Sequence, residues 1–332
     1  MNEEFRKRWE SVLQILSILA PEAKKRKQTL IFLGGSAVQS SFSEPRRVSI
    51  DLDLYYSGDR TPLIELLEKK GYQVQERPSR TKMFSFYKVT LNDVTVKMDF
   101  LNADIFMGQP KKDIAEMRKL KVGKTSFSAL IAKPSYLIAS KFAALAIGTI
   151  GRKSKETEQI DLLKDVYDLD CFGDFSVIGG TWEQYRRIIK MQNELWKTKF
   201  SINEVNKSIE KTLLEIGSLS PERYRISDGN LGNFNEYLVH GRVKPTDLAT
   251  MAYRLLMHLK ATQRVTENLK NRHIQPKNIE GHLYKLSDDE GVLSFYEAAL
   301  KNQFSAEELH KLKIMTPDAL VFLYYAMIGY AT

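Results

Sequence analysis

The clearest indications of the fold are the stretches TLIFLGGSAV, at residues 29–38, and RVSIDLDL, at residues 47–54. The first is a short apolar run, typical of a buried strand, that stops at Gly34-Gly35 and leads into a helix. The second alternates strictly, so its apolar residues share one face while Asp51 and Asp53 share the other. We therefore predict a strand, a glycine turn, a helix and a second strand in that order.

Three acidic residues on predicted strands form a candidate metal site. Asp51 and Asp53 stand at i and i+2, so both carboxylates point the same way and can hold one divalent cation. Asp99 lies on the polar face of a later strand-like segment. Oxygen ligands suit Mg²⁺ or Mn²⁺, and three convergent carboxylates are what two-metal phosphoryl transfer requires. Each acid taken alone could be a solvent-facing strand residue, but the ordered combination favours a site.

The glycine turn is the second part of this pattern. Gly34 and Gly35 let backbone N–H groups approach a phosphate, and Ser36 adds a hydroxyl at the start of a helix. The turn lacks the Gly-Lys-Ser/Thr of a Walker A loop and the spacing of a dinucleotide-binding fingerprint. A Gly-Gly pair is by itself only a turn, so its meaning depends on the acids that follow.

The remaining chain divides into two halves of different character. Strand-like segments cover residues 72–76, 82–91 and 94–101, with Asn92-Asp93 as the turn of a hairpin. From Pro134 onward we predict helices at about 134–150, 156–170, 182–217, 245–271, 289–302 and 305–330. The expected domains are an α/β core at 1–130 and a helical domain at 131–332.

Charge and composition exclude several classes of protein. The 332 residues carry 50 Lys and Arg against 41 Asp and Glu, a balance of +9. Residues 1–130 hold 23 basic and 16 acidic side chains, a surplus of seven that suits either solvated surfaces or a polyanion. No apolar run reaches the ~18–20 residues of a membrane span, and no secretory signal opens the chain. One cysteine excludes an internal disulfide framework, so we expect a cytoplasmic protein with no membrane partner.

The motifs together resemble the AbiEii/AbiGii-type nucleotidyltransferases, which belong to the DNA polymerase β-like superfamily and include toxins of type IV toxin–antitoxin systems. The resemblance rests on five segments spanning residues 34–169: Gly34–Val38, Arg47–Leu54, Val96–Phe100, Leu137–Lys141 and Lys164–Leu169. It departs from the family pattern at Ser140, where the family has Glu. The implied fold is α+β: a polymerase β-like core, with a mixed sheet and flanking helices, followed by a helical C-terminal domain.

The resemblance also implies a role for each site residue. Gly34, Gly35 and Ser36 would bind the nucleotide triphosphate, Asp51 and Asp53 would bind both metals, Asp99 would bind metal and help deprotonate the attacking hydroxyl, and Lys141 would reach the triphosphate from the helical domain. Asp165 would orient that lysine or lie near the attacking group, whereas Asp168 is equally well explained as a helix-surface residue. The implied site is a cleft between the two domains.

The implied reaction moves NMP from an NTP to a hydroxyl with loss of pyrophosphate. RNA, with the tRNA 3′ end as the leading acceptor, and a cognate antitoxin are the expected partners. The alternatives are a small-molecule nucleotidyltransferase, acting on an antibiotic or metabolite, and a non-catalytic nucleotide-binding member of the fold. The three acids favour an enzyme, and the basic surplus favours RNA over a neutral acceptor.

Two further groups of residues could contact substrate. Arg152, Lys153 and Lys155 lie in an insertion between Lys141 and Asp165 that is either a substrate-binding loop or a solvated one. Among the aromatics, Tyr56 beside the acids could stack on a base. Phe84, Phe86 and Tyr87 suit strand packing better than base stacking.

Overall fold

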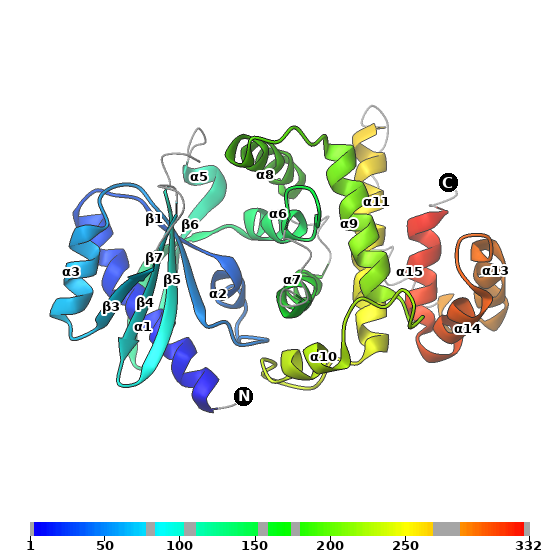
Figure 1. Ribbon diagram of the computed structural model, residues 1–332, viewed down its shortest axis with the longest axis horizontal. Helices are drawn as coiled ribbons and strands as arrows, with labels where there is room; N and C mark the ends of the chain where they lie inside the picture. Colours follow the sequence, from blue (N-terminus) through cyan, green and yellow to red (C-terminus); the bar gives the residue numbers. More distant parts are fainter. Residues whose placement is uncertain are drawn as a thin grey trace. The chain divides into compact units, whose positions relative to one another are not determined.

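The computed structural model describes residues 3–77, 84–102, 111–151, 159–173, 180–267 and 286–328. The insertion with Arg152, Lys153 and Lys155 lies outside these ranges. The chain forms two compact units (Figure 1). The first contains Met1–Leu137 and Glu236–Gly241, and the second contains Ile138–Asn235 and Arg242–Thr332.

A seven-stranded mixed sheet forms the centre of the first unit, in the order β3-β4-β5-β2-β1-β7-β6. The strands are β1 (Leu30–Leu33), β2 (Asp51–Tyr56), β3 (Gln73–Arg77), β4 (Phe84–Leu91), β5 (Val94–Asn102), β6 (Ala115–Val122) and β7 (Thr125–Ala132). Strand β2 runs parallel to β5 and antiparallel to β1, and β1 runs parallel to β7. The outer pairs are antiparallel hairpins, and Asn92 and Asp93 turn from β4 to β5 with positive φ, as their sequence predicts.

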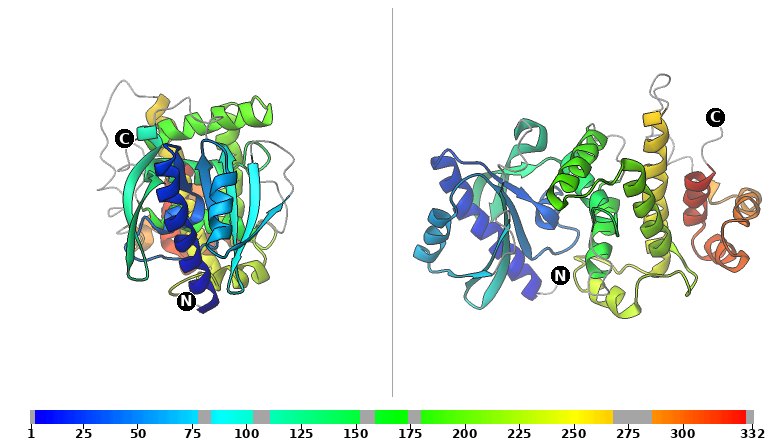
Figure 2. Two further views of the ribbon diagram at one scale, coloured as in Figure 1. Left: turned by 90° about the vertical axis from the view of Figure 1, so that its left-hand side faces the viewer. Right: turned by 45° about the horizontal axis from the view of Figure 1, so that its top comes forward.

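Helices cover both faces of this sheet. The helices α1 (Glu3–Lys25) and α3 (Thr61–Lys69) lie side by side on one face (Figure 2, left). Strand β2 turns Leu52 and Leu54 toward that face, and β5 turns Met98 and Phe100 the same way, so all four are buried. The short helix α2 (Gly34–Gln39) packs against β1 and β2, and α5 (Lys111–Ile114) precedes β6. The polar side chains of β2 and β5 therefore lie on the face opposite α1 and α3.

A distant segment completes the first unit. Residues 236–241 lie beside the residues that lead into β2, through an isolated antiparallel bridge between Arg47 and Leu238. Backbone N–H groups of Val48 and Val239 donate to carbonyl groups across this bridge, at 2.8 and 3.1 Å. The approach to β2 is thus held by chain that follows it by almost two hundred residues.

The second unit is helical. Its helices are α7 (Gln159–Cys171), α8 (Thr181–Trp196), α9 (Ile202–Gly217), α10 (Asp228–Asn235), α11 (Pro245–Glu267), α13 (Glu290–Leu300), α14 (Ala306–Met315) and α15 (Pro317–Met327), together with most of α6 (Pro134–Ala144). The long helix α11 packs against α9 and α15. Two of the predicted helices are divided: Lys197 has φ +54° between α8 and α9, and Pro317 begins a new helix after α14.

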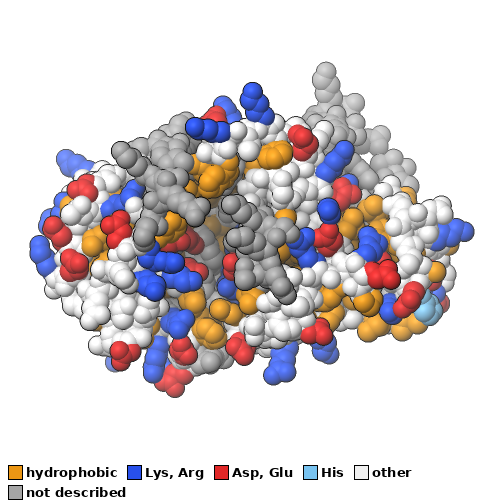
Figure 3. All heavy atoms as spheres, in the orientation of Figure 1, with side chains coloured by type: hydrophobic (Ala, Val, Ile, Leu, Met, Phe, Trp, Pro, Cys, Tyr) orange, Lys and Arg blue, Asp and Glu red, His pale blue; other side chains and the backbone are white. Residues whose placement is uncertain are grey.

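The predicted α+β fold, with a mixed sheet, flanking helices and a helical C-terminal half, is confirmed. The hairpin β6–β7 is a structural element that the hydrophobic pattern did not predict. Large apolar side chains are exposed on the C-terminal helices, where Figure 3 shows them among charged ones; they include Phe295, Ile314 and Met315. Within the described ranges, no helix combines the length and the apolar character needed to span a membrane.

Candidate active site

The three predicted acids lie on neighbouring strands, on one face of the sheet. Strands β2 and β5 pair in parallel with Asp53 opposite Asp99 and Asp51 opposite Lys97. Side chains at paired positions project to the same side of a sheet, and neighbouring strands are about 4.8 Å apart. The pairing therefore gathers three carboxylates from two separate sequence motifs. All three are half-buried.

Gly34 brings backbone against one of these carboxylates. Its φ is +68°, in the left-handed region, and a Cβ added there would lie 1.8 Å from Oδ2 of Asp53. A side chain at this position is therefore disfavoured twice, by backbone conformation and by collision. The glycine turn and the Asp53 side chain are in direct contact, as the sequence motif requires.

The Ser36 side chain is turned toward the protein. Its hydroxyl donates a 2.6 Å hydrogen bond to the backbone carbonyl of Asp51, and the residue is fully buried. Ser36 thus fixes the helix α2 to the first residue of β2. Its expected contact with a triphosphate stays a prediction, since the hydroxyl is already engaged here.

Burial and charge make the acidic cluster costly without a cation. Oδ1 of Asp51 is buried with no hydrogen-bond partner among the described residues, a state that folded proteins generally avoid. Burial, and secondarily the charge of Asp51, raise the pKa of Asp99 to about 6, against the opposing effects of Lys97 and Arg77. Near neutral pH Asp99 can still lose its proton, and its negative charge then lies close to the carboxylate of Asp51.

These features test whether the residues fit a divalent metal ion. The donor set consists of hard carboxylate oxygens, and the unsatisfied Asp51 oxygen is the kind of atom that a cation would satisfy. No group of three or more His, Cys, Asp or Glu side chains in the described part of the chain is drawn together closely enough to hold an ion as it stands. The residues therefore fit in chemistry and in strand register, and the side chains would have to converge further on binding.

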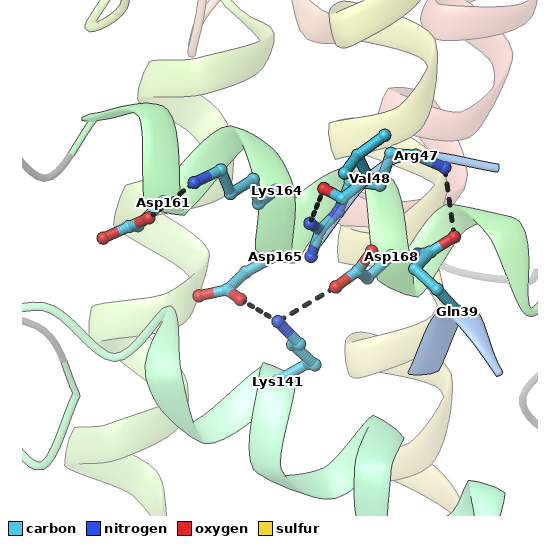
Figure 4. Close-up of polar contacts among 8 residues, drawn as sticks. All are labelled: Gln39, Arg47, Val48, Lys141, Asp161, Lys164, Asp165 and Asp168. Atoms are coloured by element: carbon cyan, nitrogen blue, oxygen red, sulfur yellow. Dashed lines mark hydrogen bonds and ion pairs between the residues drawn. The ribbon is translucent and has the colours of Figure 1, made fainter. Parts of the chain in front are cut away.

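Arg47 lies behind the glycine turn and is buried, with 2% of its surface exposed. A Cβ added to Gly35 would lie 2.7 Å from its Nη2 atom, so the guanidinium packs directly on this glycine. Its Nη1 donates to the carbonyl of Val48 at 3.1 Å, and its backbone N–H donates to Oε1 of Gln39 at 3.1 Å (Figure 4). The sequence motif contains Arg47, but its pattern gave no sign that this cation supports the turn.

Tyr55 continues the polar face of β2, two residues after Asp53. It is buried, and its hydroxyl forms a 2.5 Å hydrogen bond with the hydroxyl of Tyr136 in the first turn of α6. Burial, followed by Tyr136 and Asp53, raises the pKa of Tyr55 well above its ordinary value. The pair therefore stays protonated and links residue 136, which belongs to the first unit, to the strand that carries the acids.

A second charged cluster lies within the helical unit. The ammonium group of Lys141, on α6, contacts the carboxylates of Asp165 and Asp168, on α7, at 2.5 and 2.9 Å (Figure 4). Both aspartates are fully buried, and the lysine side chain is 11% exposed. The structure thus brings together the predicted pair Lys141 and Asp165. It also shows that Asp168 is a second partner of the lysine rather than a surface residue, as its i, i+3 spacing from Asp165 on one helix could have indicated.

A match to a protein family covers the residues of the acidic cluster and of the Lys141 cluster. A family model described as "Nucleotidyl transferase AbiEii toxin, Type IV TA system" matches residues 17–225, more than half of the chain. Among solved structures, an antigenic nucleotidyltransferase-like protein from Paracoccidioides brasiliensis is 14% identical, with a TM-score of 0.33 over 58% of this chain and 95% of that one. The curated proteins contain no match.

Proposed function

Because the chain belongs to the AbiEii nucleotidyltransferases, the toxins of type IV toxin–antitoxin systems, we propose that it moves NMP from an NTP to the 3′ hydroxyl of RNA, with the tRNA 3′ end as the acceptor. Membership in the family gives an NTP as substrate and an antitoxin as counterpart. The RNA acceptor and the dependence on Mg²⁺ or Mn²⁺ are our proposals. The observation that supports metal-dependent transfer is the strand register that places Asp53 beside Asp99, and the basic surplus of residues 1–130 supports the RNA acceptor.

The proposed reaction is a single displacement at the α-phosphorus. The acceptor oxygen forms a bond to that phosphorus, the bond to the bridging oxygen of the β-phosphate breaks, and pyrophosphate leaves. Asp99 would accept the hydroxyl proton as a general base. Asp51, Asp53 and Asp99 would hold the metal ions, whose charge would offset that of the triphosphate.

Other residues would position the substrate. Backbone N–H groups at Gly34 and Gly35 would lie along the triphosphate, with the Arg47 guanidinium supporting the turn. Lys141 would supply a positive point charge to the triphosphate, and Asp165 and Asp168 would hold its ammonium in place. Such catalysis depends chiefly on positioning and electrostatic stabilisation.

The test is label transfer by the full-length protein. Purified protein would be incubated with Mg²⁺, each α-labelled NTP in turn and total tRNA, and transferred label would be resolved by size. We expect label on tRNA with at least one NTP, and a loss of about 10²–10⁴-fold in Asp99→Asn. Asp93→Asn, the same chemical change in the β4–β5 turn, serves as the matched control.

The outcomes separate the proposal from its alternatives. Label found only on small molecules would replace RNA by a small-molecule acceptor. Unchanged behaviour of Asp51→Asn and Asp53→Asn proteins in every assay would reject catalysis by these acids. Transfer that persists in chelator-treated protein without added metal would reject the metal dependence.

A further inference from the structure

The sheet face that carries the acids continues across β5, β4 and β3. Phe86 on β4 pairs with Asp99, and Phe84 pairs with Leu101. On the far side, Phe86 pairs with Arg77 of β3. One row across four neighbouring strands therefore contains Arg77 on β3, Phe86 on β4, Asp99 on β5 and Asp53 on β2.

The two phenylalanines on this face are arranged for stacking rather than for packing in the core. Both are half-buried, and their rings are parallel, with an interplanar angle of 3° and centroids 6.0 Å apart. Tyr87, the residue between Phe86 and Lys88 in the sequence, points to the opposite face, where it is buried. Tyr56 is also buried, at 1% exposure, and contacts Phe100 in the core, so it cannot be the base-stacking residue that the sequence suggested. Flat aromatic surfaces near an active site are typical binding surfaces for nucleobases.

Exposed cations lie in the next row of the same face. Lys88 and Lys97 are both exposed and directly opposite each other across β4 and β5. Like charges at paired positions destabilise a sheet. Both strands are internal to the sheet, so protection of an open edge, which is the usual reason for strand lysines, does not explain them. A polyanion bound to this face would offset the repulsion between the two lysines.

We propose that these five residues, Arg77, Phe84, Phe86, Lys88 and Lys97, form a binding face for the single-stranded 3′ end of the RNA acceptor. Terminal bases stack on the phenylalanines, and backbone phosphates contact the basic side chains. Single-stranded RNA combines unstacked bases with regularly spaced phosphates, and this face offers both kinds of contact. The terminal hydroxyl then lies beside Asp99, one strand away from Phe86. This inference rests on the proposed function and names the surface that selects its acceptor.

Binding is measured separately from transfer, with the full-length protein and no NTP. Fluorescence anisotropy follows an end-labelled single-stranded RNA oligonucleotide across a range of salt concentrations. For single strands, each phosphate contact contributes about 0.7 to the slope of log K against log salt. Lys88→Gln with Lys97→Gln should lower that slope by about 1.4. Lys69→Gln with Lys70→Gln, at the exposed end of α3, makes the same change in net charge away from this face and should leave the slope unchanged.

Stacking is tested with aromatic variants. Phe86→Leu should weaken RNA binding roughly tenfold, within the range measured for loss of one stacked base. Phe86→Trp, which keeps a flat ring, should restore it. Phe295→Leu, at an exposed aromatic of the helical unit, is the control for loss of an aromatic side chain. Thermal unfolding of each variant shows that the fold is intact.

The transfer assay then separates a failure of the binding face from a failure of the proposed function. If the protein labels tRNA and Phe86→Leu raises the RNA KM while the NTP KM is unchanged, the face is supported. If it labels tRNA and both sets of variants bind and react like the wild type, the inference is wrong and the proposed function stands. If the protein labels only small molecules, RNA is not its acceptor and the proposed function is wrong. Weakened RNA binding in the variants would then still show that this face binds RNA. Equal binding of duplex RNA or heparin, insensitive to Phe86→Leu, would reject the recognition of single strands.

Discussion

Replacing Lys141 by Met should destabilise the helical unit by about 3–5 kcal/mol at pH 7. The substitution keeps an apolar stem but removes the charge that two fully buried carboxylates contact at 2.5 and 2.9 Å. With an effective dielectric constant of about 20, each contact corresponds to roughly 6 kcal/mol of attraction. Most of this offsets the cost of burying three charges, so the expected net loss is that of removing one partner from a buried ion cluster.

The sign of this prediction follows from the charge of the cluster: Lys141→Met leaves two carboxylates buried without the cation that they contact. Replacing all three groups by neutral ones (Lys141→Met, Asp165→Asn and Asp168→Asn) should recover most of the stability, because no charge is then buried without its partner.

The measurement is urea unfolding followed by tryptophan fluorescence. The chain has three tryptophans, of which Trp9 lies on α1, and Trp182 and Trp196 lie on α8. In a Trp9→Phe background the signal reports the helical unit alone. A loss of less than 1 kcal/mol in Lys141→Met would contradict this prediction. So would a triple variant less stable than the single one.

Three further outcomes follow from the acidic face. In metal-free protein, ¹³C NMR should show Asp99 titrating near pH 6, and Asp51→Asn should lower this pKa by removing a neighbouring charge; an unmoved pKa would contradict the coupling. Gly34→Ala should reduce transfer at least 100-fold, since its Cβ would strike the carboxylate of Asp53. Gly71 is also at positive φ, but a Cβ added there would meet no atom within 4 Å, so Gly71→Ala should cost only about 1–2 kcal/mol of stability. Equal transfer activities of the Gly34→Ala and Gly71→Ala proteins would contradict the role of the collision. Ser36→Ala should lower the melting temperature by several degrees, through loss of one buried hydrogen bond of about 1 kcal/mol, and an unchanged melting curve would contradict that role.

The local parts of the site could be predicted because their patterns are short. Alternation around Asp51 and Asp53 fixes which side of a strand they occupy, and Gly34 marks a backbone conformation that other residues avoid. The pairing of Asp53 with Asp99 joins residues 46 positions apart, and the distance along the chain leaves no periodic signal for it. Alternation placed Asp99 on the polar face of its own strand, and the resemblance to a known family supported it as the third acid, but neither showed that its strand pairs with that of Asp53.

Burial is the part that sequence patterns predicted least well. Asp168 occupies a helix position that suits either a surface pair or an internal one, and only the packing of α6 on α7 decides for the buried state. Tyr56 and Phe86 are both aromatic residues on strands of the same sheet, yet they lie on opposite faces. Strand register assigns those faces, and register depends on pairing between segments that are distant in sequence.

The segment 236–241 has a consequence for how the protein is made. It supplies the backbone partners of Arg46 and Val48, so the approach to the acidic strand is incomplete until that segment has been synthesised. At about 5–20 residues per second, translation from residue 137 to residue 241 takes roughly 5–20 s. During that interval the nascent chain contains Asp51, Asp53 and Asp99 but lacks the backbone partners of Arg46 and Val48. A ribosome-bound or truncated product that ends before residue 236 would therefore carry these acids on a strand whose approach is unsupported.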